Sequence, residues 1–128
     1  MIACVMSDGT AVPTSCCGTG RVYDFVAGER LGWSVDHECG ALECGRGELP
    51  EDLRRAIMEH YGVFRLRFAA DPGSRRVAVM KVLREFGTPL SRLKAVLEDG
   101  LTGTEAEMTV ARRHLARAGV ALVLERQG

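Results

Sequence analysis

The sequence has few aromatic side chains, 5% of its 128 residues, and no net charge, because 17 lysines and arginines balance 17 aspartates and glutamates. It also lacks an apolar run of the roughly 20 residues that a membrane-spanning helix needs. Residues 1–6 have neither the basic start nor the length of a signal peptide. A hydrophobic content of 46% and a charged content of 27% are typical of a globular protein, so we expect a folded cytoplasmic protein that does not enter a membrane.

The zero net charge hides a strong asymmetry along the chain. Residues 1–62 carry 5 basic and 10 acidic side chains, a net charge of −5, whereas residues 63–128 carry 12 basic and 7 acidic side chains, a net charge of +5. Such polarity indicates two surfaces with different partners, or two halves that attract each other. We therefore divide the chain at Gly62 into an acidic, cysteine-containing region and a basic unit.

The first region, residues 1–62, has the pattern of a small antiparallel sheet with one helix. Strands are predicted at residues 2–6, 21–26, 30–35 and within 36–45, with a loop at residues 13–20 and a hairpin turn at residues 27–28. The acidic pair Glu51 and Asp52 after Pro50 predicts a helix that ends near Tyr61. The only tryptophan, Trp33, is expected to pack in the core.

The second region, residues 63–128, has the order strand, helix, helix, short crossing, helix, strand. Residues 63–68 alternate apolar and charged side chains, and residues 120–124 are a continuous apolar run, as expected of strands. Helices are predicted after caps at Ser74, Thr88 and Thr104, the last with Glu107 in a capping box. Apolar spacing predicts a core made of Leu66, Val79, Val82, Leu83, Phe86, Leu90, Leu93, Val96, Leu97, Met108, Ala111, Leu115, Ala118 and Leu122.

This order, with the octapeptide Val-Ala-Val-Met-Lys-Val-Leu-Arg at residues 77–84, Leu90, Lys94 and the hexapeptide Ala-Gly-Val-Ala-Leu-Val at residues 118–123, resembles the C-terminal domain of the bacterial large-subunit ribosomal stalk protein. The resemblance covers about residues 63–125. It implies an α+β fold in which the N-terminal sheet and helix are followed by a β-α-α-β-α-β unit. The family's helical dimerisation segment and flexible hinge have no counterpart in residues 1–62, and Pro89 lies in a loop that the family makes longer and richer in glycine. The chain therefore resembles a stalk-type domain on another scaffold.

In the stalk family, the first helix of this domain is the surface on which translation factors dock, through an apolar patch ringed by basic residues. Carried over residue by residue, the resemblance implies a docking face made of Arg76, Val77, Met80, Lys81, Arg84 and Lys94. No stacking aromatics are interleaved with these charges and the whole chain is neutral, so we expect a protein partner with an acidic surface rather than nucleic acid. A solvated helix face without a partner is the alternative.

Five cysteines are many for a chain of this length, and Cys16, Cys17, His37, Cys39 and Cys44 lie within thirty residues. Thiolate and imidazole ligands suit zinc, but the spacing lacks the usual Cys-x-x-Cys knuckle. A nucleophilic Cys16 or Cys17 with His37 as base is a further alternative, and disulfides do not suit a cytoplasmic protein with an odd cysteine count. We expect reduced, partly buried thiols and no cofactor.

The sequence contains no phosphate-binding loop and no carboxylate pair placed for acid and base roles. Our leading hypothesis is therefore a small, non-enzymatic adaptor that binds a protein through the basic and apolar helix face. An antitoxin or immunity-type inhibitor that blocks a toxin enzyme through the acidic region is the second hypothesis. A zinc- or thiol-dependent protein built on the cysteine and histidine cluster is the third.

Overall fold

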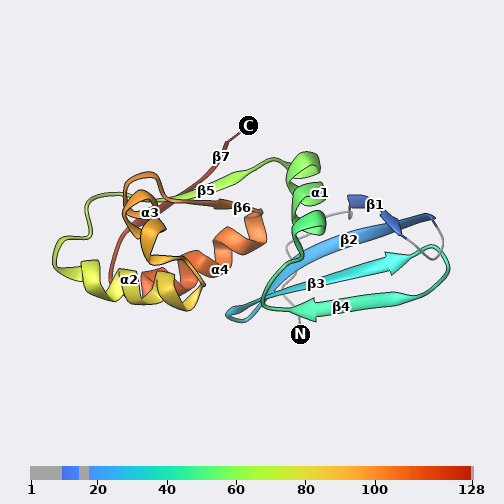
Figure 1. Ribbon diagram of the computed structural model, residues 1–128, viewed down its shortest axis with the longest axis horizontal. Coiled ribbons are helices and arrows are strands. Elements are labelled where there is room, and N and C mark those ends of the chain that lie inside the picture. The colour runs from blue at the N-terminus through green and yellow to red at the C-terminus, as the bar shows by residue number, and fades with distance from the viewer. Residues whose placement is uncertain (1–9, 15–17, 128) are drawn as a thin grey trace.

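A computed structural model of the chain describes residues 10–14 and 18–127, and Figure 1 shows the arrangement of their elements. The strands β1 (Thr10–Thr14), β2 (Gly18–Ala27), β3 (Arg30–His37) and β4 (Leu42–Arg46) precede helix α1 (Glu51–Tyr61). Then follow β5 (Phe64–Phe68), α2 (Arg76–Glu85), α3 (Leu93–Asp99), β6 (Leu101–Gly103), α4 (Glu105–Ala116) and β7 (Leu122–Arg126). Two short 3-10 turns, Gly73–Arg75 and Leu90–Arg92, lead into α2 and α3. None of the described helices is long and apolar enough to cross a membrane.

The strands described in the first half form one antiparallel sheet in the order β1-β2-β3-β4. This arrangement confirms the predicted antiparallel sheet with one helix. The hairpin predicted around residues 27–28 is present, because Ala27 pairs with Arg30. The loop predicted at residues 13–20 is wrong for residues 13–14, which belong to β1, and for residues 18–20, which belong to β2. The strand predicted at residues 2–6 lies outside the described residues.

The inner side of this sheet carries the first core. Val22, Val26, Leu31 and Val35 are buried there with Leu49 and with Ile57 of α1. Trp33 packs against this core in a partly buried position, and its ring lies over Gly45, where any side chain would collide with it. The expectation of Trp33 as a core residue therefore agrees with its packing.

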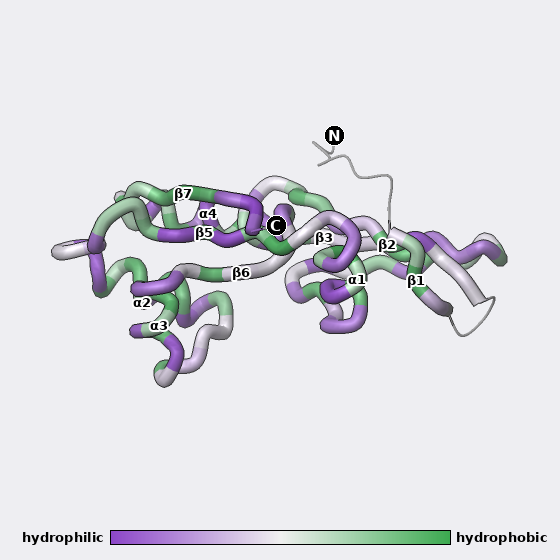
Figure 2. The backbone as a smooth tube through the Cα atoms, turned by 90° about the horizontal axis from the view of Figure 1, so that it is seen from above, coloured by the Kyte–Doolittle hydropathy of each residue, from purple (hydrophilic) through white to green (hydrophobic). Residues whose placement is uncertain are grey.

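The strands described in the second half form a separate antiparallel sheet in the order β6-β5-β7. The sequence of elements is the predicted β-α-α-β-α-β order. Of six residues central to the predicted core, Leu66, Val79, Leu83, Leu93 and Leu115 are buried, and Leu122 packs against them in a partly buried position. The two sheets do not join, and they lie at opposite ends of the molecule in Figure 2.

The local details of the two middle helices differ from the prediction. Ser74 and Thr88 do not cap a helix, because 3-10 turns at Gly73–Arg75 and Leu90–Arg92 come first. Leu90, on the second turn, is therefore 69% exposed rather than buried. Phe86 is 41% exposed because α2 ends just before it. Its ring and the ring of His114 form a T-shaped pair with centroids 5.1 Å apart. Val82 is only partly buried.

Helix α4 belongs to both cores. Ala106 and Val110 pack in the first core, whereas Met108, Ala111 and Leu115 pack in the second. Residues 106 and 110 lie one helical turn apart on one side, and residues 108, 111 and 115 lie on another. One helix thus supplies side chains to the interiors of both halves.

The N-terminus of α4 is also tied to the first half by buried polar groups. The predicted capping box is present: Thr104 Oγ1 accepts from the backbone N–H of Glu107, and the Glu107 carboxylate accepts from the backbone N–H of Thr104. The Thr104 hydroxyl donates to Asp24 of β2 at 2.5 Å, and Arg54 of α1 donates to Glu107 at 2.8 Å. Burial raises the pKa of Asp24 above its usual value, an effect that the Thr104 hydrogen bond opposes.

Because α4 is shared, unfolding of the second core should also open the first. Leu83→Asp places a charge in the second core and removes a buried leucine, a loss of several kcal/mol. Trp33 packs against the first core, so its fluorescence reports that half. We expect Leu83→Asp to lower the urea midpoint of the Trp33 transition strongly, and Val77→Asp, on the exposed face of the same helix, to leave it nearly unchanged. A normal Trp33 transition in Leu83→Asp would show that the halves unfold independently.

The raised pKa of Asp24 predicts a specific pH dependence of stability. The folded state holds this proton more tightly than the unfolded state, so Asp24 makes the protein less stable as pH rises from the unfolded pKa through the folded pKa. Asp24→Asn removes this effect while keeping an oxygen that can accept from Thr104. We expect urea unfolding to give similar stabilities for both proteins below about pH 4 and a more stable Asn variant at pH 7.

Asp36→Asn removes one exposed carboxylate and is the matched control for the loss of a charge. The lowered pKa of Glu125, caused mainly by its hydrogen bond from Arg67, has the opposite sign and is common to all three proteins. A constant difference between Asp24→Asn and wild type from pH 4 to pH 7 would contradict the prediction.

Candidate functional site

The exposed face of α2 carries most of the residues that the stalk resemblance marks for docking. Val77, Lys81 and Arg84 follow one another at intervals of four and three residues, so they lie along one side of the helix. That side points away from Val79 and Leu83, which are completely buried. Val77 is 78% exposed, an unusual position for a branched apolar side chain.

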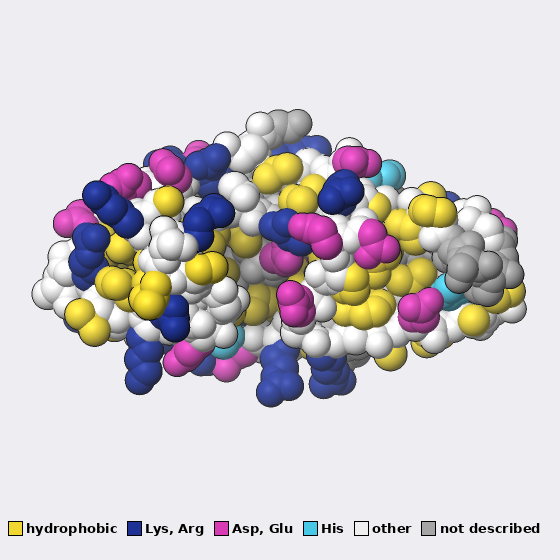
Figure 3. Space-filling view, viewed as in Figure 1, with side chains coloured by type: hydrophobic (Ala, Val, Ile, Leu, Met, Phe, Trp, Pro, Cys, Tyr) yellow, Lys and Arg dark blue, Asp and Glu magenta, His cyan; other side chains and the backbone are white. Residues whose placement is uncertain are grey.

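Positive charge surrounds this apolar side chain. Lys81 and Arg84 are exposed, and among the described residues neither has a recorded ion pair. Arg76 is exposed too, with Nη1 4.0 Å from Asp71 Oδ1, at the limit of an ion pair. Figure 3 shows hydrophobic side chains with lysines and arginines among them at the α2–α3 end of the molecule.

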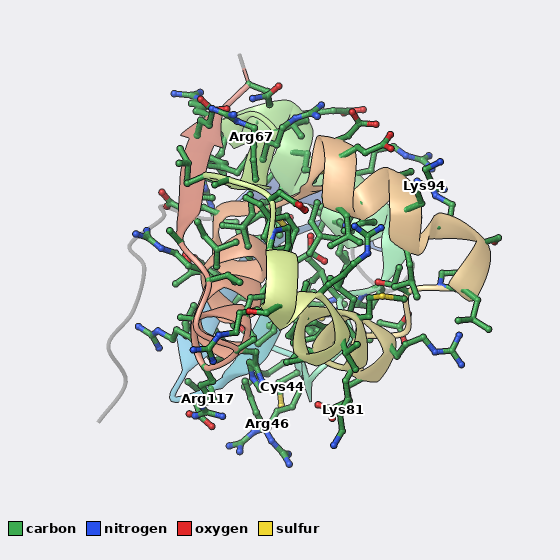
Figure 4. The ribbon with its side chains drawn as sticks, turned by 90° about the vertical axis from the view of Figure 1, so that its left-hand side faces the viewer. Cys44, Arg46, Arg67, Lys81, Lys94 and Arg117 are labelled. Atoms are coloured by element: carbon green, nitrogen blue, oxygen red, sulfur yellow. The ribbon has the colours of Figure 1, made fainter. Side chains whose placement is uncertain are left out.

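Two of the expected docking residues have different roles from those we inferred. Met80 packs against the second core and is only partly exposed, so the thioether is not a freely accessible contact. Lys94 lies on α3 and, in Figure 4, projects well away from Lys81. The structure therefore brings Arg76, Val77, Lys81 and Arg84 together on α2 and leaves Lys94 apart from Lys81.

An open cleft of about 980 Å³ lies between the two halves. Met108, Val110 and Ala111 of α4 line it, together with the C-terminal end of α2 and the segment from Arg46 to Glu51. The charged lining consists of five glutamates, at positions 29, 48, 51, 85 and 107, and of three arginines, at positions 30, 46 and 54. Sequence reasoning missed this cleft, because its residues come from distant segments that only the shared packing of α4 brings together.

The histidine in the cleft already has close neighbours. His114 Nε2 lies 2.8 Å from the carbonyl oxygen of Glu29, and the ring meets Phe86. Arg113 donates to the carbonyl oxygen of Gly28, and Arg117 forms an ion pair with Glu29. These contacts join the C-terminal part of α4 to the β2–β3 turn, so His114 has a structural role.

The predicted cysteine and histidine cluster is divided by the strand register. Val35 pairs with Glu43 and Ser34 pairs with Cys44, so Glu43 faces the side of the sheet that carries Val35 and His37, and Cys44 faces the other side. His37 Nε2 contacts Glu43 Oε1 at 2.7 Å. Cys39 lies in the β3–β4 turn, and both Cys39 and Cys44 are exposed rather than partly buried as expected.

Cys16 and Cys17 lie outside the described residues, so the expectations for them remain predictions. Within residues 10–14 and 18–127, no group of three or more histidine, cysteine, aspartate or glutamate side chains is arranged to hold a metal ion. Comparison of the chain with protein-family models, with curated proteins and with solved structures gave no significant match.

The register predicts that the protein purified without reductant or chelator contains well under one zinc ion per chain. Cys44 faces away from His37, so these two groups cannot share an ion without a change in strand pairing. Elemental analysis of the purified protein tests this expectation, with Cys39→Ser and Cys44→Ser as comparisons. A stoichiometric zinc content that both substitutions abolish would establish a metal site instead.

Proposed function

We propose that this protein is a small, non-enzymatic interaction module that binds an acidic protein surface through the exposed face of α2. The observation that carries the proposal is Val77, an apolar side chain that is 78% exposed and has Lys81 four residues away on the same helix. Neither side chain is needed for the second core, which uses the opposite face. A side chain that contributes nothing to folding, in an apolar and basic setting, suits recognition.

The stalk resemblance supports the same choice of surface. In that family the first helix of the domain docks protein partners, and α2 is the first helix of the β-α-α-β-α-β order here. In this proposal, Arg76, Lys81 and Arg84 attract and orient the acidic partner, and Val77 forms the apolar centre of the contact. Met80 packs against the second core beneath this face. Lys94 lies on α3, away from Lys81, and is not part of the centre of the contact.

The cleft favours the second hypothesis, an immunity-type inhibitor of a toxin enzyme. Glu48 and Glu85 line it from two different elements. A basic loop of an enzyme would fit a cleft with this charge, and inhibition would need surface complementarity and no chemistry. This candidate uses a different surface from the exposed face of α2, so substitutions can separate the two.

The proposal predicts that charge reversal on α2 weakens partner binding without loss of stability. Partners are first isolated from the native host by pull-down. The rates of association and dissociation are then measured with purified components. Lys81→Glu with Arg84→Glu should slow association about tenfold or more and reduce its salt dependence. Val77→Ser should mainly speed dissociation. Exposed substitutions change the free energy of unfolding by about 0.5 kcal/mol at most, so the melting temperature should hardly move.

The matched control is Arg55→Glu with Arg112→Glu, which makes the same change in net charge at exposed positions of α1 and α4. It should leave association nearly unaffected. Equal weakening by both pairs would indicate a general charge effect and would remove the α2 face from the proposal. Loss of binding in Glu48→Lys with Glu85→Lys alone would favour the cleft.

A further inference from the structure

The first sheet has an outer face, opposite the side that carries Val22 and Val26. Side chains alternate along β2, so Tyr23 and Phe25 point to this outer face. The register aligns Tyr23 with Ser34 and Cys44, and Phe25 with Gly32 and Arg46. Among the described residues, Tyr23 and Phe25 pack against neither of the two cores.

The Phe25 ring packs over Gly32, which leaves room for it because glycine has no side chain. A Cβ atom at Gly32 would come within 2.3 Å of Phe25 Cε2, and within 2.7 Å of Cζ, so the ring covers the glycine directly. Gly32 is buried by this contact, whereas Phe25 remains partly exposed. The exposed part of this ring is therefore accessible to a ligand.

Arginine is concentrated on the same face. Of the five basic residues in the acidic first half, Arg21, Arg30 and Arg46 lie on the outer face by register, and the other two, Arg54 and Arg55, are on α1. Among the described strand residues of this face the acidic one is Asp36, which pairs with Arg21. Arg46 lies across the sheet from Gly32, next to the Phe25 ring, and Figure 4 shows it projecting outward from β4. The described strand positions of this face thus carry more basic than acidic side chains, and Arg30 and Arg46 also line the cleft.

We propose that the outer face, defined by Tyr23, Phe25, Arg30 and Arg46, binds single-stranded nucleic acid. Two bases stack on the Tyr23 and Phe25 rings, and the guanidinium groups of Arg30 and Arg46 contact phosphates. Residues two apart on a strand are separated by about 6.7 Å, roughly twice the 3.4 Å spacing of stacked bases, so both rings can be used only by unstacked bases. This geometry selects a single strand over a duplex.

This inference is independent of the docking face on α2. No stacking aromatics are interleaved with the charges of α2, so we expect a protein partner there. On the sheet, the aromatic and basic residues are far apart in the sequence, and the strand register brings them together. An acidic protein would use the arginines but would leave the Phe25 ring without a stacking partner, which favours nucleic acid for this surface.

The test is fluorescence anisotropy of a labelled single strand of about 12 thymidine or uridine nucleotides, started at about 50 mM salt. Tyr23→Leu with Phe25→Leu keeps apolar side chains but removes both rings, and should weaken binding by at least about tenfold. Arg30→Gln with Arg46→Gln should reduce the slope of log affinity against log salt by about 1.4, since each phosphate contact on a single strand contributes about 0.7.

Lys81→Glu with Arg84→Glu, on α2, is the control and should bind the oligonucleotide like wild type. Trp33 fluorescence and thermal melting verify that each variant is folded, and the exposed arginine pair tests the surface even if the leucine variant is unstable. Absence of saturable binding, or binding unchanged in both sheet variants, would overturn the proposal. Equal competition by a duplex or by polyglutamate would also overturn it, because either result would indicate simple attraction of anions.

Discussion

The N-terminus of α4 is where the two halves of the molecule are held together. Thr104 caps this helix and at the same time donates its hydroxyl proton to Asp24, which is buried on the inner side of the first sheet. Glu107 closes the capping box and also receives the Arg54 side chain from α1. A capping box alone would satisfy two backbone donors, whereas here its side chains also bond to the first half. Because buried polar groups are costly to separate from their partners, this arrangement fixes the start of α4 against β2 and α1.

The position of α4 decides which surfaces remain available. With Ala106 and Val110 in one core and Leu115 in the other, the helix has little surface left for a further partner. The side chains of Val77 and Lys81 on α2, and of Tyr23 and Phe25 on the outer face of the first sheet, take no part in either core. Recognition can therefore be assigned to these surfaces without conflict with folding. The cleft differs from them, because α4 itself lines it and changes there would also affect the packing of the two halves.

The fold could be predicted from the sequence wherever a pattern was local. The alternation of apolar and charged residues in β5 and the Thr104 to Glu107 capping box were sufficient to place a strand and a helix start. The predicted starts of α2 and α3 were wrong, because a capped helix start and a 3-10 turn are both compatible with the local sequence. Ser74 and Thr88 are good caps by type, but the chain enters α2 and α3 through 3-10 turns. Leu90 lies on the second of these turns and is exposed, although its spacing predicted burial.

The sequence by itself determined the α+β class, the antiparallel first sheet, the strand–helix–helix–helix–strand order of the second half and the exposure of Lys81 and Arg84, because each depends on the periodicity of a single segment. Strand β6, which occupies the predicted crossing, was implied only by the stalk resemblance. Only the tertiary structure decided that α4 serves two cores, and that Cys44 faces away from His37. It alone decided that Phe25 and Arg46 lie side by side, with Gly32 beneath the ring. These features depend on which strands pair and in which register, and a shift of one residue would turn every side chain of a strand to the other face. Contacts between distant segments set that register, so no single stretch of the sequence contains it.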